Sequence, residues 1–302
     1  MYLRAIFKNK DTMIKQLSVI AVLSLMFAFN AYAGENQQKE KVVTGKWSFV
    51  IGSAKVANHY LSDQEYKGSV LGFSMDFGSF YKKSDKLSWD VDVTYILAPY
   101  IDVLEISTLA NPSKTSYYAL HSLRADYGTY YNWNPVKNLN IKAGGKFDVL
   151  GGFTMAKPNH VNNLMDLDFQ AQLKAAAGIR YGWNFKKWGI FLQADVAIPF
   201  MGLALGGDTY QNAFDGIGSS ELLPGTIQIC HFTSFHNLTG FNTEFELDFV
   251  FGKTILFLAS EYNNRWWHFN GIQNYRLYNM TKIGLMVDLV ARNRHNSNNR
   301  YF

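Results

Sequence analysis

The clearest pattern in the chain is a strict alternation of apolar and polar residues between Leu164 and Phe200. Apolar side chains recur at every second position from Met165 to Trp183, and the opposite parity includes Asp166 and Asp168. Because successive side chains on a strand point to opposite faces, this period predicts two long antiparallel strands joined by a turn at 185–187. Soluble sheets seldom need strands this long. The apolar face is therefore predicted to face lipid and the polar face a lumen, as in a transmembrane β-barrel.

The same alternation recurs along the rest of the chain. It predicts further strands at Gly45–Val56, Tyr66–Tyr81, Leu87–Leu97, Tyr117–Trp133, Leu139–Thr154, Leu238–Phe251, Thr254–Tyr262 and Tyr278–Ala291. Short connections alternate with longer ones, of which the longest lie at about 98–115, 200–236 and 263–275. The pattern predicts an all-β fold, an antiparallel transmembrane β-barrel of about ten strands with periplasmic turns and longer extracellular loops.

The N-terminus carries a targeting signal. Lys10 and Lys15 precede an apolar run from Leu17 to Phe29, and Ala31-Tyr32-Ala33 offers small residues for a signal peptidase. An N-terminal anchor would need about 20 apolar residues, and this run is shorter. The predicted division is a signal peptide at 1–33, a periplasmic lead-in at 34–44, the barrel at 45–292 and a C-terminal tail at 293–302. No later apolar stretch is long enough for a spanning helix, so insertion into a membrane requires a closed barrel.

Composition supports this class without adding a function. Aromatic residues make up 16% of the 302 residues, and there are only 6 prolines, which favours a pleated sheet. Cys230 is the single cysteine and cannot form an internal disulfide. The net charge of +5 comes from scattered Lys and Arg, which argues against a nucleic-acid partner.

The tryptophans test the orientation of the strands. Those on the apolar parity near the chain entry or a short turn are Trp47, Trp89, Trp133, Trp183 and Trp188. They are predicted to form one ring of interface aromatics at the periplasmic side of the membrane. Trp266 and Trp267, at the other end of their strand, are predicted to mark the opposite rim.

Charged residues follow the inward parity. The predicted lumen charges are Asp90, Asp92, Arg124, Asp126, Lys142, Lys146, Asp166, Asp168, Lys174, Glu244 and Glu246. Two interpretations remain open: the charges pair and fill a narrow interior, or they line a narrow, weakly cation-preferring channel. Neighbouring carboxylates such as Asp166 and Asp168 could act in acid–base catalysis, but inward acids occur on almost every strand, which favours a structural role.

A third hypothesis is a surface hydrolase built from rim residues. Such an enzyme needs a histidine with an acid or a serine, and the candidates are His231, Ser234, His236 and Asp208. Their spacing matches no omptin-like protease or outer-membrane phospholipase motif. The histidines also lack a tight metal-ligand spacing, so the sequence predicts no metal site and no cofactor. The primary expectation is a barrel that is not an enzyme and is either structural or interacts through its loops.

The signal, the aromatic-rich alternating strands and the terminal Phe302 together resemble Gram-negative outer-membrane β-barrel proteins. Ile198-Pro199-Phe200-Met201-Gly202 before a long loop, followed by Ser234-Phe235-His236-Asn237, resembles an uncharacterised barrel family of Bacteroidetes. The resemblance implies the outer membrane of a Gram-negative bacterium as the location. It also implies outer-membrane lipid and the barrel-assembly machinery as partners, and no known activity. One departure is that 293–300 separates the last predicted strand from Phe302.

Overall fold

The computed structural model describes residues 42–58, 65–80, 86–103, 117–156, 165–185, 188–205, 230–251, 254–269 and 272–290. The predicted signal peptide, the C-terminal tail and the loop residue Asp208 lie outside these ranges. Residues 42–44, expected in a lead-in, already belong to the first strand.

The described residues form eleven β-strands. They are β1 (Val42–Asn58), β2 (Glu65–Phe80), β3 (Leu87–Val103), β4 (Tyr117–Trp133), β5 (Leu139–Ala156), β6 (Met165–Asn184), β7 (Gly189–Leu205), β8 (Cys230–Ser234), β9 (Leu238–Phe251), β10 (Thr254–Phe269) and β11 (Ile272–Val290). No helix in the ranges that the structure describes is long and apolar enough to cross a membrane.

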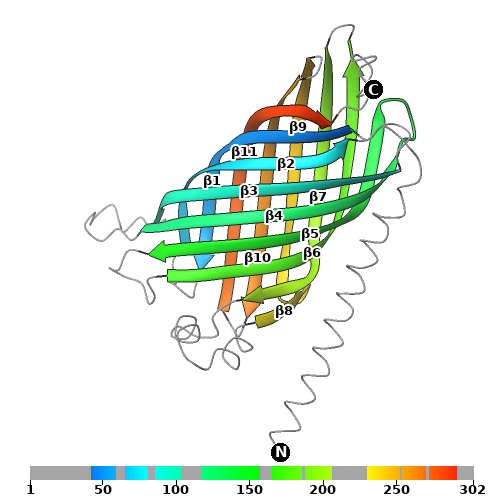
Figure 1. The fold of residues 1–302 in the computed structure, drawn as a ribbon. Coiled ribbons are helices and arrows are strands. Elements are labelled where there is room, and N and C mark those ends of the chain that lie inside the picture. The colour runs from blue at the N-terminus through cyan, green and yellow to red at the C-terminus, as the bar shows by residue number, and fades with distance from the viewer. Residues whose placement is uncertain are drawn as a thin grey trace, which may run out of the picture. The chain divides into compact units, whose positions relative to one another are not determined.

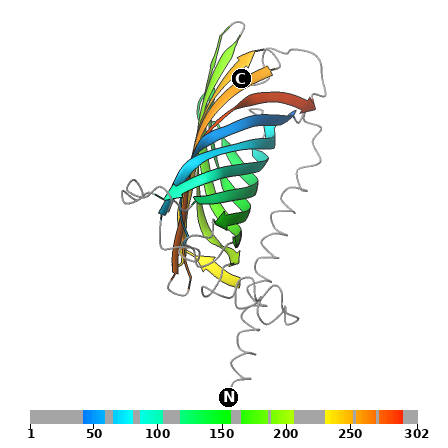
Figure 2. The ribbon, with the colours of Figure 1, turned by 90° about the vertical axis from the view of Figure 1, so that its left-hand side faces the viewer.

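The strands close into a barrel. From β1 to β7 each strand pairs antiparallel with the next, and β9, β10 and β11 continue in the same way. The last strand then pairs with the first, from Val43 opposite Val290 to Asn58 opposite Asn274. This seam places blue β1 beside red β11 in both views (Figures 1 and 2). Closure pairs the strands of the ring on both sides over most of their length, which is the condition for a sheet to span lipid.

Two strands share one place in the barrel. The first part of β7 pairs with β9, from Gly189 opposite Val250 to Ala197 opposite Asn242. Its last part pairs with β8, between Met201 and Leu205. The eleven strands therefore occupy ten places in a closed ring, which confirms the predicted barrel and its strand number.

Asn237 holds the turn between β8 and β9. Its side-chain oxygen accepts a hydrogen bond from the Ser234 amide at 2.9 Å, and its side-chain nitrogen donates to the Phe232 carbonyl at 2.9 Å. Its own carbonyl accepts from the His268 amide of β10 at 2.9 Å. These bonds replace the ladder pairs that the interruption removes.

The predicted alternation is observed on both faces. Large apolar side chains on the outside are exposed, including Phe49 at 74% and Phe245 at 60%, whereas Asp148, Lys174 and their inward neighbours are buried. The hairpin of β6 and β7 turns at 185–188, where the Phe185 amide donates to the Trp188 carbonyl at 2.8 Å. An apolar exterior around a charged interior is the arrangement of outer-membrane barrels rather than of soluble proteins.

The prediction of a loop at 263–275 is wrong. β10 continues to Phe269, which lies opposite Ile272 at the start of β11, so only residues 270 and 271 connect the two strands. The sequence there is Asn270-Gly271, the dipeptide that two-residue hairpin turns favour. The two ends of the barrel nevertheless differ. We name them the short-turn end, with connections 81–86, 134–138, 185–188 and 252–253, and the long-loop end, with connections that include 104–116 and 206–229.

Two other strands run past a proline near which the sequence predicted an end. β3 runs past Pro99 to Val103, with a shift of register between Ala98 and Ile101. β7 runs past Pro199 to Leu205, and its register with β6 shifts where Lys174 pairs with Pro199. Proline cannot donate a ladder hydrogen bond, so both strands accommodate it at an irregularity instead of ending there.

Candidate functional site

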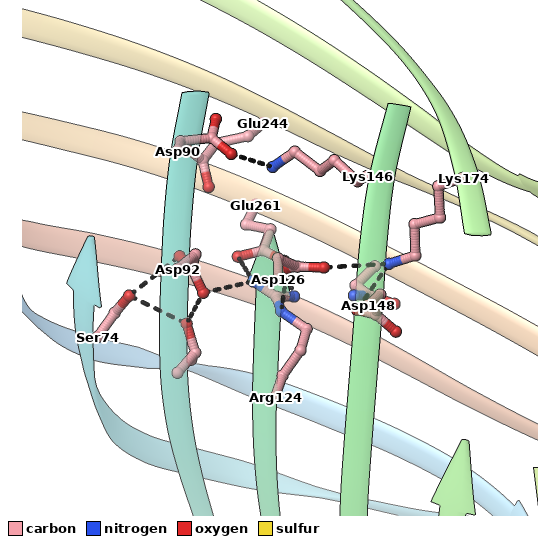
Figure 3. A network of polar contacts seen from close by, with 12 residues as sticks. Ser74, Asp90, Asp92, Arg124, Asp126, Lys146, Asp148, Lys174, Glu244 and Glu261 are labelled. Carbon is pink, nitrogen blue, oxygen red and sulfur yellow. Dashed lines mark hydrogen bonds and ion pairs between the residues drawn. The ribbon is translucent and has the colours of Figure 1, made fainter. Parts of the chain in front are cut away.

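The middle of the lumen contains a network of charged side chains from opposite walls. We call it the central network, and it consists of Asp92, Arg124, Asp126, Asp148, Lys174, Glu244, Glu261, Arg265 and Lys282. Figure 3 shows most of these residues converging from β3, β4, β5, β6, β9 and β10. Each is held by a strand whose inward parity is polar at this level, so alternation alone brings the side chains into the bore.

Arg124 is the centre of the network. Its guanidinium contacts both oxygens of Glu261, one of them at 3.1 Å, and lies 3.0 Å from Asp126. Asp92 is 3.5 Å from the same guanidinium. The planar fork of an arginine suits such two-oxygen contacts with a carboxylate. Arg124 and Glu261 are 5% and 0% exposed, so this contact is shielded from water.

The Arg124–Glu261 pair crosses the full width of the barrel. Arg124 lies on β4 and Glu261 on β10. β3, β2, β1 and β11 separate these strands in one direction, and β5, β6, β7 and the shared β8–β9 place separate them in the other. The two strands are therefore opposite each other in the ring. A side-chain contact between opposite walls means that the charges close the bore at this level.

Further pairs reinforce the closure. Asp148 of β5 accepts from Lys174 of β6 at 2.8 Å and from Arg265 of β10 at 2.9 Å. Lys282 of β11 donates to Glu244 at 2.7 Å and lies 2.9 Å from Glu261. Charged groups removed from water are tolerated when they are paired and hydrogen-bonded in this way.

The long-loop half of the lumen is filled mainly by apolar side chains. One buried cluster, which we call the apolar cluster, comprises Val50, Ala54, Val56, Tyr66, Val70, Ile96, Ala98, Leu120, Tyr278 and Met280. Beside it, Arg276 reaches Asp168 at 2.8 Å, and both side chains are buried. The interior between the central network and the long-loop end is thus packed rather than open.

The short-turn half of the lumen contains a cavity of about 390 Å³. Its lining includes Asp76, Asp90, Asp92, Lys46, Lys142, Lys146, Arg180, Asp195 and Glu244 together with Tyr130, Asn132, Asn138, Asn140 and Gln193. Arg124 and Asp126 of the central network also line it, so the network borders the cavity. A volume of this size is within the range of small-molecule sites. We call this space the lumen cavity.

The predicted lumen charges are found as follows. Arg124, Asp126, Asp168, Lys174 and Glu246 are buried, and Asp90, Asp92, Lys142, Lys146 and Glu244 line the lumen cavity. Asp166 belongs to β6, but its side chain lies outside the described residues. The structure brings Asp92, Arg124, Asp126, Lys174 and Glu244 together in the central network. Lys142 is outside it and pairs with Asp195 at 2.8 Å.

Sequence reasoning missed Glu261, Arg265 and Arg276. The predicted loop contained Arg265, because the strand before it was predicted to end too early and the strand after it to begin too late. The signal was present, because Glu261, Asn263 and Arg265 continue the two-residue period of the preceding segment. Which charge meets which across the bore depends on how the sheet closes, and a linear pattern does not contain that information.

Four tryptophans of the predicted ring lie on the outward parity of their strands, and Trp188 lies in the turn just before β7. Trp133, Trp183 and Trp188 are 59%, 44% and 41% exposed at the short-turn end. Trp47 and Trp89 are partly exposed. At the opposite end Trp266 faces outward, but the prediction for Trp267 is wrong, because this side chain is 7% exposed and packs inside with Leu238. β10 places successive residues on opposite faces, so only one of two adjacent tryptophans can face outward.

Two hydrolase candidates meet on the turn between β8 and β9. Ser234 Oγ and His236 Nδ1 are within hydrogen-bond distance, and the contact is exposed. His231 belongs to β8, and Asp208 lies outside the described residues. Within those residues, no group of three or more His, Cys, Asp or Glu side chains is placed to hold a metal ion.

The sequence matches a known protein family between residues 17 and 296, described as Protein of unknown function (DUF3316). The chain belongs to this DUF3316 family. No curated protein matches the sequence. The family description assigns no activity, so membership leaves the function open, and an origin in Bacteroidetes stays a prediction.

Several solved structures are similar at low sequence identity. The outer membrane protease OmpT from Escherichia coli is 8% identical, with a TM-score of 0.45, and the match covers 82% of this chain and 97% of that one. The translocator domain of the autotransporter NalP from Neisseria meningitidis is 11% identical with a TM-score of 0.38, covering 91% and 98%. Neisserial surface protein A is 10% identical with a TM-score of 0.31, covering 82% and 97%. The outer-membrane-type barrel of this chain follows from its own strand pairing.

Proposed function

We propose that this protein is an integral outer-membrane barrel whose lumen is closed, and that its role is structural or depends on interactions of the long-loop end. The observation that carries the proposal is the Arg124–Glu261 contact between opposite walls. It lies within a network of paired charges and is backed by the apolar cluster. A continuous water path would have to disrupt buried ion pairs, whose loss of a partner costs about 3–5 kcal/mol.

Conductance in planar bilayers tests the closed lumen. The wild-type barrel is expected to give no stepwise currents. The double variant Arg124→Ala/Glu261→Ala removes the cross-bore contact but leaves the apolar cluster in place, so stepwise currents are expected only when Leu120→Ala is added to it. Lys55→Ala/Glu65→Ala, which removes a 2.7 Å ion pair between outward-facing residues, is the matched control and should stay silent. Stepwise openings in the wild type would overturn the proposal whatever the variants do.

The proposed location is the outer membrane, with its lipid and the barrel-assembly machinery as the expected partners. Support comes from the closed sheet and from exposed apolar residues such as Phe49 and Leu285 on its outer face. Fractionation of cells is expected to recover the protein with outer membranes. Folded and heat-denatured samples should migrate differently on gels. Recovery as a soluble protein would contradict this location.

A narrow channel is the second candidate. The lumen cavity favours it, because about 390 Å³ of the short-turn half is open. A channel would need both the central network and the apolar cluster to separate transiently. The same conductance experiment decides between the two, since a channel predicts wild-type openings and a closed lumen predicts none.

A surface hydrolase is the third candidate, supported by the Ser234–His236 contact. A neighbouring base activates a serine hydroxyl in such enzymes. We propose that the protein is not an enzyme, because this pair is exposed and no acid is observed beside it among the described residues. Lipid or peptide turnover by the wild type that disappears in His236→Ala would overturn that proposal.

A further inference from the structure

The lumen cavity contains an ion pair that is longer than the hydrogen-bonded pairs on its walls. Lys146 lies 3.9 Å from Asp90, beyond hydrogen-bond distance. By contrast, Lys142 is 2.8 Å from Asp195, and Lys282 is 2.7 Å from Glu244. Asp90 also accepts a long hydrogen bond, 3.3 Å, from the Tyr130 hydroxyl. The Asp90–Lys146 pair therefore leaves charged hydrogen-bonding capacity unused in a partly enclosed site.

Both members of this pair remain partly accessible. The Asp90 side chain is 33% exposed and that of Lys146 is 21% exposed, although both face the interior. A lysine ammonium has three donors, and a carboxylate accepts through two oxygens. A ligand that brings a carboxylate to Lys146 and an ammonium to Asp90 could form short charge-assisted bonds with each. Figure 3 shows the two side chains pointing toward each other from β3 and β5.

The lining as a whole favours a ligand without net charge. The cationic lining residues are Lys46, Arg124, Lys137, Lys142, Lys146 and Arg180, and the anionic ones are Asp76, Asp90, Asp92, Asp126, Asp195 and Glu244. These sets are equal in number, so a strongly charged ligand of either sign would leave one set uncompensated. Asn132, Asn138 and Asn140 add neutral donors and acceptors that suit a peptide group.

We propose that the lumen cavity binds a small zwitterion, an amino acid or a short peptide, with its ammonium on Asp90 and its carboxylate on Lys146. The central network forms the inner wall of this site, and the ligand enters from the short-turn end, which the sequence predicts to face the periplasm. The inference rests on the proposed function in one respect, namely that the closed lumen makes the cavity a blind pocket rather than a segment of a pore.

Calorimetric titration of the purified, folded barrel in detergent tests the site. The probe is L-alanyl-L-alanine. The comparison ligand is its N-acetylated C-terminal amide, which has the same backbone and neither charge. Binding of the dipeptide and at least about tenfold weaker binding of the blocked analogue are expected, because two charge-assisted contacts are lost. No binding of the dipeptide at millimolar concentration, or equal binding of both, overturns the proposal.

Substitutions test whether the dipeptide binds at Asp90 and Lys146. Asp90→Asn and Lys146→Gln should each weaken dipeptide binding by about tenfold or more. Lys55→Gln and Glu65→Gln, on the outer face, should leave it unchanged. Heat-modifiable gel migration establishes that each variant is folded. If Lys146→Gln does not fold, Lys146→Arg keeps the charge and should retain binding. Unchanged affinity in the folded Asp90 and Lys146 variants overturns the assignment.

Conductance separates this inference from the proposed function. Dipeptide binding without wild-type currents supports both. Binding together with wild-type currents overturns the closed lumen and keeps the binding site. If there is neither dipeptide binding nor a wild-type current, the closed lumen is supported and the binding site is overturned.

Discussion

The two halves of the lumen are built differently although the same strands form both. Toward the long-loop end, inward positions carry apolar residues such as Leu120 and Met280, and both are fully buried. Toward the short-turn end, inward positions on β3 and β5 carry Asp90 and Lys146 around a cavity. One half therefore gains stability from close packing, and the other retains space and unused polar groups. Stability and binding capacity are separated along the barrel axis, with the central network between them.

The largest loss of stability is expected from a substitution in the central network, at the boundary between the two halves. Asp148→Ala removes the carboxylate that Lys174 and Arg265 share and leaves two cations buried. The free energy of unfolding, measured with urea in phospholipid vesicles, should fall by about 3–5 kcal/mol. Glu65→Ala on the outer face is the control. A loss below about 1 kcal/mol for Asp148→Ala would mean that the network contributes little.

Truncation of a packed apolar residue should cause the next largest loss in the free energy of unfolding. Leu120→Ala empties part of the apolar cluster and is expected to lower the free energy of unfolding by about 3 kcal/mol. Tyr130→Phe at the lumen cavity removes only a 3.3 Å hydrogen bond and should cost less than about 1 kcal/mol. The same urea titration measures both. Equal losses would contradict the contrast between the two halves.

A matched pair of glycines gives a smaller test. A Cβ at Gly152 would lie 2.7 Å from a guanidinium nitrogen of Arg276, which is held in the packed half by Asp168. Gly152→Ala is expected to cost about 1–3 kcal/mol through overpacking. A Cβ at Gly178 would meet the Lys142 and Asp195 side chains, which can move into the lumen cavity. Gly178→Ala should therefore cost less than about 1 kcal/mol, and a reversed order would refute the packing difference.

The smallest effect is expected outside the barrel. Glu65→Gln weakens the 2.7 Å pair with Lys55, whose side chain is 39% exposed. Exposed ion pairs contribute about 0–1 kcal/mol, so the urea midpoint should barely change. A larger change would indicate that the outer face near the long-loop end contributes to stability beyond this pair.

Much of the fold could be predicted from local pattern. The bounds of β9, Leu238–Phe251, agree with the predicted segment, and the faces of β6 and β7 follow their alternation. This works because a barrel strand has lipid on one side and lumen on the other along its whole length. The prediction was wrong where a proline suggested an end, at Pro99 and Pro199, and where Asn270-Gly271 was not read as a hairpin turn.

The candidate site was predictable only in part. The sequence assigned Arg124 and Asp126 to the lumen, but not the contact of Arg124 with Glu261 on the opposite wall. That contact depends on strand order, register and the diameter of the ring, which are properties of the closed sheet. The difference between the packed and open halves likewise depends on which inward side chains meet at the same height.

The seam between β1 and β11 has a consequence for biosynthesis. The first and last described strands pair along almost their whole length, so the barrel cannot close until β11 has been made. A chain that stopped before Ile272 would leave β1 and β10 as two unpaired edges, and lipid offers no hydrogen bonds to satisfy them. Closure of the ring therefore depends on β11, and chains truncated before it are expected to fail to insert into a membrane.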